Sequence, residues 1–197
     1  MNLFTLTIIL FLIMDPVGNI SSFLAMLKGL PQEKRKFVII REMLIALAAM
    51  LAFNFLGEYI FNILEISEPT LYLASGAILL LVAIKILFPS TDSLRANLPA
   101  GEPFITPLAI PLIAGPSLLA TIMLFAHLEP SMPTMFIAII IAWVLAALVL
   151  LCGSRLQKLI GNNGLMACER LMGMVLIMIA IQRFAEGIQA FIKVGHA

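Results

Sequence analysis

Apolar residues occur in six long runs along this chain. Within a few residues, the runs cover 3–27, 37–57, 69–88, 104–126, 135–153 and 165–188. Each run is close to the roughly 20 apolar residues that a helix needs to cross a bilayer. Because lipid cannot satisfy backbone polar groups, spans of this kind are expected to be helices. The pattern predicts an all-α membrane protein with six transmembrane helices.

Composition supports this prediction and leaves no room for a separate soluble domain. The 197 residues are 62% hydrophobic and 12% charged, and the mean hydropathy is +1.11. Soluble domains average about 45–50% apolar and about 25% charged residues. The two cysteines, Cys152 and Cys168, lie in or beside apolar runs and indicate no disulfide framework.

The two halves of the chain resemble one another. The matches pair 76–85 with 173–182, Gly57 with Gly153, and Asp15-Pro16 with Gly115-Pro116. Because each half contributes an odd number of helices, the second half must enter the membrane from the opposite side. We therefore expect one membrane domain built of two inverted three-helix repeats, 1–88 and 104–197, joined by a cytoplasmic connection at 89–103. Inverted repeats are typical of secondary transporters.

Positive charges predict the orientation of the chain. Of the twelve lysines and arginines, all but Arg183 and Lys193 fall in or beside the first, third and fifth connections between runs. Cytoplasmic connections carry the excess of positive charge in membrane proteins. These connections are therefore predicted to be cytoplasmic, which places both termini in the periplasm.

Two of the apolar runs are interrupted, and these interruptions predict broken helices 1 and 4. The first contains Asp15-Pro16-Val17-Gly18-Asn19, and the fourth contains four prolines ending in Gly115-Pro116-Ser117. An aspartate in a membrane helix costs about 2.5–3.5 kcal/mol on insertion scales. Proline removes a backbone donor, and irregular backbone at membrane depth is tolerated only next to protein or a water-filled cavity. Both breaks are therefore expected to face inward.

The short helices after the breaks offer N-termini that favour an anion such as a substrate carboxylate. Asp15 adds a negative charge that could take an ammonium group, a sodium ion or a proton. The candidate substrate-binding residues are Asp15, Gly18, Asn19, Ser21, Gly115, Ser117 and Thr121. A plainer interpretation stays open, in which the breaks are packing kinks and Asp15 caps the helix that follows it.

Charged residues at the predicted cytoplasmic ends of the second and sixth helices are candidates for gating or ion coupling, together with Asp15. They are Arg41, Glu42, Glu169 and Arg170. For Arg41 and Glu42, the alternative is that they anchor the second helix at the membrane interface. An enzyme is not expected, because Asp15 is the only aspartate in an apolar run and a paired acid and base would need a second carboxylate. No metal or cofactor is expected beyond a coupling sodium ion or proton.

Several motifs together resemble the MarC family of bacterial inner-membrane proteins, which is grouped with the LysE-like exporters. They are the Asp15–Asn19 motif, Arg41-Glu42, Pro99-Ala100-Gly101-Glu102, the Pro107 to Pro111 segment, Ala114-Gly115-Pro116 and Glu169-Arg170-Leu171-Met172-Gly173. The resemblance covers essentially the whole chain, and in size the chain is most similar to the short YhgN-type members. The family includes SnatA, a transporter of small neutral amino acids.

The resemblance implies a multi-pass protein of the bacterial inner membrane that transports glycine, alanine or threonine, coupled to protons or sodium. Its expected partners are a small-molecule substrate and the lipid bilayer, with a homodimer left open and no nucleic acid. The alternatives are a transporter of another small solute, or a non-transporting membrane protein that scaffolds or regulates a partner.

Overall fold

The computed structural model describes residues 2–27, 31–64, 67–88, 113–128 and 131–194. Within these ranges the chain is helical and contains no strand. The helices are α1 (Leu3–Met14), α2 (Pro16–Met26), α3 (Gln32–Leu64), α4 (Glu68–Leu87), α5 (Pro116–Leu128), α6 (Met132–Leu151) and α7 (Gly153–Val194). The all-α prediction is confirmed for the described part of the chain.

Among the described residues, five segments are long and apolar enough to cross a membrane. They are Leu3–Leu24, Lys34–Gly57, Pro69–Leu87, Pro133–Leu151 and Gly153–Lys193. The predicted fourth run is represented by the shorter apolar helix Pro116–Leu128. The start of that run, at 104–112, and the predicted connection at 89–103 lie outside the described residues. The structure therefore supports a multi-pass helical protein, and the number of six spans stays a prediction.

Large apolar side chains are exposed on the outer faces of the spans, as expected of helices that meet lipid. Phe4, Leu81 and Met178 are each more than 60% exposed. Such exposure of large apolar side chains is unusual in a soluble protein but normal for a helix surrounded by hydrocarbon. The buried core contains small as well as large side chains, including Leu6, Leu79, Ile122, Ala138 and Leu176.

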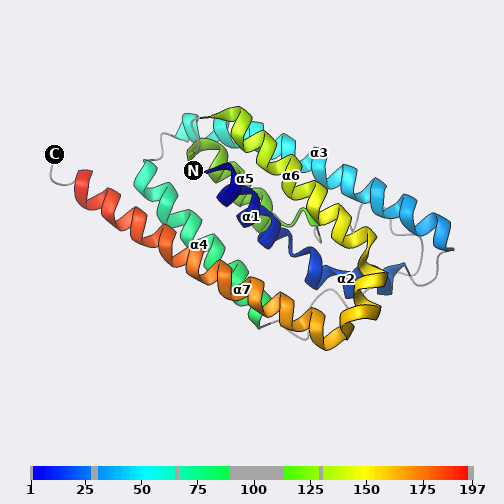
Figure 1. The fold of residues 1–197 in the computed structure, drawn as a ribbon. Coiled ribbons are helices and arrows are strands. Elements are labelled where there is room, and N and C mark those ends of the chain that lie inside the picture. The colour runs from blue at the N-terminus through cyan, green and yellow to red at the C-terminus, as the bar shows by residue number, and fades with distance from the viewer. Residues whose placement is uncertain (1, 28–30, 65–66, 89–112, 129–130, 195–197) are drawn as a thin grey trace.

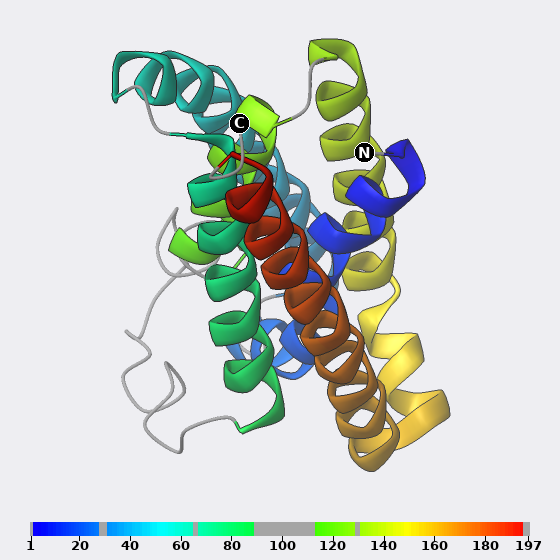
Figure 2. The same ribbon diagram turned by 90° about the vertical axis from the view of Figure 1, so that its left-hand side faces the viewer.

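The helices pack in an order that the ribbon views make clear (Figures 1 and 2). Helices α4 and α7 lie side by side along their length, α3 lies against α5 and α6, and α1 lies against α6. Helix α2 contacts α7 and α6, whereas α5 contacts α4 and α3. The start of α1 and the end of α7 lie toward the same end of the bundle (Figure 1).

Glycines allow α4 and α7 to approach closely. A Cβ atom built on Gly76 would lie 2.8 Å from a ring carbon of Phe184 and 3.0 Å from the carbonyl oxygen of Ala180. A Cβ atom on Gly173 would lie 2.9 Å from Leu87. Each helix thus presents a glycine to a large side chain of the other, a contact of small residues that brings membrane helices together.

The predicted connection between the fifth and sixth runs is helical instead of a loop. Helix α7 begins at Gly153, directly after α6, and is kinked at Gly161, where φ is 70° and ψ is 173°. Glycine adopts this backbone conformation without the steric cost that a Cβ atom would impose. The kink separates a short first segment of α7 from the long membrane-spanning part.

Candidate functional site

The break in the first span is centred on Asp15, which ends α1 and begins α2. Its φ of 42° and ψ of 56° are left-handed, and it is the one non-glycine residue with positive φ in the described part of the chain. Aspartate tolerates this conformation better than most residues do. The Asp15 N–H donates to the Leu12 carbonyl at 3.2 Å, and the Asn19 carboxamide donates to the Met14 carbonyl at 3.0 Å. The break predicted in the first helix is confirmed, and its backbone is satisfied by protein.

The Asp15 carboxylate also caps α2. Its Oδ1 accepts a hydrogen bond from the Gly18 N–H at 3.1 Å, and Pro16 occupies the first helical position, where no N–H is needed. The capping interpretation is therefore confirmed. This cap occupies the Oδ1 of Asp15 and the N–H of Gly18. The Gly18 N–H is one of the groups that had been predicted to bind a substrate.

Gly18 is the point where a second carboxylate reaches Asp15. A Cβ atom built on Gly18 would lie 2.8 Å from the Cδ and the Oε1 of Glu169, and it would also meet the Oδ2 of Asp15. Both carboxylates therefore lie against the same Cα position, and only glycine leaves room for them. Two like charges in a poorly hydrated site repel one another, so a cation or proton placed between them would relieve that repulsion.

A cavity of about 320 Å³ opens beside these carboxylates. Residues from α2 and α7 line it, namely Val17, Gly18, Ser21, Gln157, Asn162, Leu165, Met166 and Glu169. The Gln157 carboxamide donates to the Asn162 Oδ1 at 2.9 Å. Small-molecule pockets measure roughly 300–1,000 Å³. This cavity is therefore of a size that suits a small polar solute.

The predicted residues of the fourth helix lie elsewhere. The Gly115 carbonyl accepts from the Leu119 N–H at 3.0 Å, and the Ser117 carbonyl accepts from the Thr121 hydroxyl at 2.8 Å. Thr121 is fully buried, and none of these three residues lines the cavity. Helix α5 packs on α3 and α4 while α2 packs on α6 and α7, and the described residues that line the cavity all come from α2 and α7.

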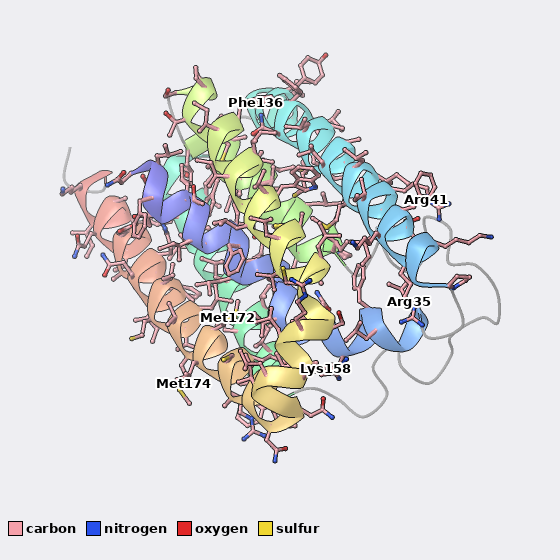
Figure 3. All side chains as sticks on the ribbon, turned by 45° about the vertical axis from the view of Figure 1, so that its right-hand side comes forward. Arg35, Arg41, Phe136, Lys158, Met172 and Met174 are labelled. Atoms are coloured by element: carbon pink, nitrogen blue, oxygen red, sulfur yellow. The ribbon has the colours of Figure 1, made fainter. Side chains whose placement is uncertain are left out.

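The charged residues predicted for gating lie on two helices, α3 and α7. Arg41 holds Glu42 within α3, with 2.7 Å between Arg41 Nη2 and Glu42 Oε1, and Glu42 is fully buried. Glu169 lies at Gly18, and Arg170 beside it on α7 is exposed. Figure 3 shows Arg35 and Lys158 far from Phe136, toward the opposite end of the bundle. Of this set, Glu169 alone lines the cavity, and it approaches Asp15 across Gly18.

Sequence reasoning missed two features. Gln157 and Asn162 line the cavity from a segment that was predicted to be a connection. Arg183 is 6% exposed within α7, and its guanidinium lies 5.4 Å from the centre of the Phe125 ring and 5.8 Å from that of Tyr72. An arginine inside an apolar run is itself a signal of a special environment. Among the described residues, no group of three or more His, Cys, Asp or Glu side chains could hold a metal ion.

Comparisons with known proteins cover nearly the whole chain. The family model described as "MarC family integral membrane protein" matches residues 1–192. A "UPF0056 membrane protein" of Buchnera aphidicola subsp. Schizaphis graminum is 47% identical over 188 residues, which are 95% of this chain and 96% of the relative.

Two further relatives illustrate the range of similarity. The "UPF0056 inner membrane protein YhgN" of Escherichia coli K12 is 46% identical, with 94% of this chain and 95% of the relative covered. A UPF0056 membrane protein of Chlamydia pneumoniae is 34% identical over 98% of this chain and 96% of the relative. No solved structure matches the chain.

Proposed function

The chain belongs to the MarC family of integral membrane proteins, and from that premise we propose that it is a secondary transporter of small neutral amino acids. The observation that carries the proposal is the broken first span, which holds Asp15 against Gly18 and Glu169, two of the residues that line a polar cavity of about 320 Å³. A multi-pass inner-membrane location is supported by the apolar spans and by the name of the Escherichia coli relative.

The packing of the helices supports an inverted-repeat architecture for this transporter. Helix α3 contacts α5 as α6 contacts α2, and α4 contacts α5 as α7 contacts α2. The buried residues Ala46 and Met50 of α3 have the buried counterparts Ala142 and Ala146 in α6. Gly76 and Gly173, which align between the halves, make reciprocal contacts between α4 and α7. Relations of this kind are expected of two copies related by a pseudo-two-fold axis.

The chemistry of the cavity suits a zwitterion. Asp15 and Glu169 provide negative charge for an ammonium group or for a coupling proton or sodium ion. Because Asp15 already occupies the Gly18 N–H, we assign the substrate carboxylate to the hydroxyl of Ser21 and the carboxamide of Gln157 on the cavity wall. The choice of glycine, alanine and threonine as substrates rests on the resemblance to SnatA, the family member that transports small neutral amino acids.

Transport by purified protein tests the proposal. The protein is reconstituted into proteoliposomes, and uptake and efflux of labelled alanine, glycine and threonine are measured with and without proton or sodium gradients. We expect an imposed gradient of the coupling ion to drive accumulation of at least one of these amino acids. Equal amounts of label in protein-containing and empty liposomes under every gradient would contradict the proposal.

Water access to the cavity separates a transporter from a packed scaffold. Cys152 and Cys168 are first replaced by serine, and a single cysteine is introduced as Ser21→Cys, since Gly18 has no room for a side chain. We expect a membrane-impermeant thiol reagent to label this cysteine. The control Met178→Cys lies on a lipid-facing surface and should stay unlabelled. Protection of both cysteines would favour a scaffold.

A further inference from the structure

The cavity between α2 and α7 has a definite order of polar and apolar groups along α7. Four of the residues that line it lie at positions i, i+3, i+4 and i+7 of that helix, namely Asn162, Leu165, Met166 and Glu169. Residues at this spacing share one face of a helix. All four follow the kink at Gly161, so they belong to one helical segment. Leu165 and Met166 therefore lie between a carboxamide toward one end of the cavity and a carboxylate toward the other.

Helix α2 follows the same order on the opposite wall. A Cβ atom built on Gly18 would lie 2.8 Å from the Oε1 of Glu169. Further along α2, Ile20 lies against the first segment of α7, 3.3 Å from a Cβ atom built on Gly153. Helix α2 thus leads from the carboxylate end of the cavity toward the segment of α7 that carries Gln157. The two ends of the cavity differ in charge, and apolar side chains lie between them.

An amino acid has one favoured orientation in such a cavity, and this step rests on the proposed function. Its ammonium group is attracted to the carboxylate end at Glu169, and its carboxylate accepts hydrogen bonds from donors at the end that carries Gln157. The α-carbon then lies in the middle of the cavity. The side chain of the amino acid therefore meets Leu165 and Met166.

These two apolar residues differ in how far they can move. Leu165 is 3% exposed and belongs to the buried core, so its neighbours hold its side chain in place. Met166 is 48% exposed, and its unbranched thioether side chain can adapt to the shape of a ligand. We propose that Leu165 is the specificity-determining residue of the transport site and sets the largest side chain that a bound amino acid can carry.

The variant Leu165→Ala tests the proposal because it enlarges the middle of the cavity. The purified protein in detergent is titrated with alanine, valine or leucine, and the rise in its unfolding temperature gives the Kd for each amino acid. One methylene more or less in a hydrophobic pocket changes selectivity about 10–200-fold. We expect the wild-type protein to bind alanine more tightly than leucine. Leu165→Ala should lower the Kd for leucine relative to that for alanine at least about tenfold.

The matched control is Leu176→Ala, because Leu176 is a fully buried leucine of α7 that does not line the cavity. It should also lower the unfolding temperature of the free protein, since it removes buried methyl groups, but it should keep the wild-type preference for alanine. If Leu165→Ala does not fold, Leu165→Val removes a single methylene and should shift the preference toward valine.

The possible outcomes separate this assignment from the proposed function. An unchanged ratio of Kd values in a folded Leu165 variant, or an equal shift in Leu176→Ala, would overturn the assignment. So would a wild-type protein that none of the three amino acids stabilises. Binding that depends on Leu165 as expected, without transport in proteoliposomes under any gradient, would contradict the transport function and leave the role of Leu165 in binding supported.

Discussion

Helix α7 carries a charged residue near each end of its long segment, and the two residues have opposite surroundings. Glu169 lies with Asp15 at a polar cavity, where two carboxylates share one glycine. Arg183 is enclosed by the rings of Tyr72 and Phe125, and its Nη1 donates to the Glu186 Oε2 at 2.9 Å. Arg183 is thus enclosed by side chains of the protein itself, whereas Glu169 lines a cavity of a size that suits a small solute. A charged residue in an apolar run therefore indicates a ligand site only where a cavity accompanies it.

The largest expected effect comes from removing the charge of Asp15. Asparagine tolerates left-handed backbone and caps helices as well as aspartate does, so Asp15→Asn should keep the fold. We expect transport in proteoliposomes to fall at least about tenfold, the loss that follows when about 1.4 kcal/mol of an interaction with the transported solute or ion disappears. Circular dichroism and gel filtration check that the variant is folded. Full transport by a folded Asp15→Asn variant would remove Asp15 from the site.

A smaller effect is expected from Gly18→Ala, which tests whether the two carboxylates need the space above this glycine. The added Cβ atom would lie 2.8 Å from Glu169, so one carboxylate must move. Overpacking of this kind costs roughly 1–3 kcal/mol, and we expect both reduced transport and a lower unfolding temperature. The control Gly153→Ala meets Ile20 at 3.3 Å and should be milder. Equal behaviour of the two variants would contradict the close approach at Gly18.

The smallest expected effect is at the enclosed end of α7. Arg183→Lys keeps the positive charge but loses the planar group that faces Phe125 and Tyr72. Desolvated cation–π contacts are worth up to about 2 kcal/mol, so the unfolding temperature should fall by a few degrees. Labelling of Ser21→Cys should be unchanged in this background, because Arg183 does not line the cavity. A strong change in labelling with no change in stability would show that Arg183 acts on the transport site.

Local features of the site could be predicted from the sequence, whereas its tertiary contacts could not. The break at Asp15 follows from a proline and a glycine inside an apolar run, and aspartate is a common helix cap. The approach of Glu169 to Gly18 depends on how α7 packs against α2, which the composition of neither segment encodes.

The start of α7 at Gly153 was harder to predict than its apolar part, which was predicted at 165–188. Polar residues such as Gln157 and Asn162 resemble a loop when they stand between two apolar runs, yet they continue the helix on either side of Gly161. Similarly, Arg183 was counted only as an exception to the predicted orientation, and its aromatic enclosure comes from two other helices. Both misses arise because a single sequence shows which residues are apolar but not which partners surround them.

The kink at Gly161 has a mechanical consequence for the cavity. Gln157 and Asn162 lie on the two sides of this residue, and both belong to the same cavity wall. A Cβ atom on Gly161 would meet nothing within 4 Å, so neighbouring side chains do not clamp the backbone there. The shape of the cavity wall therefore depends on the torsion angles of this one residue, and the hydrogen bond from Gln157 to Asn162 spans the kink.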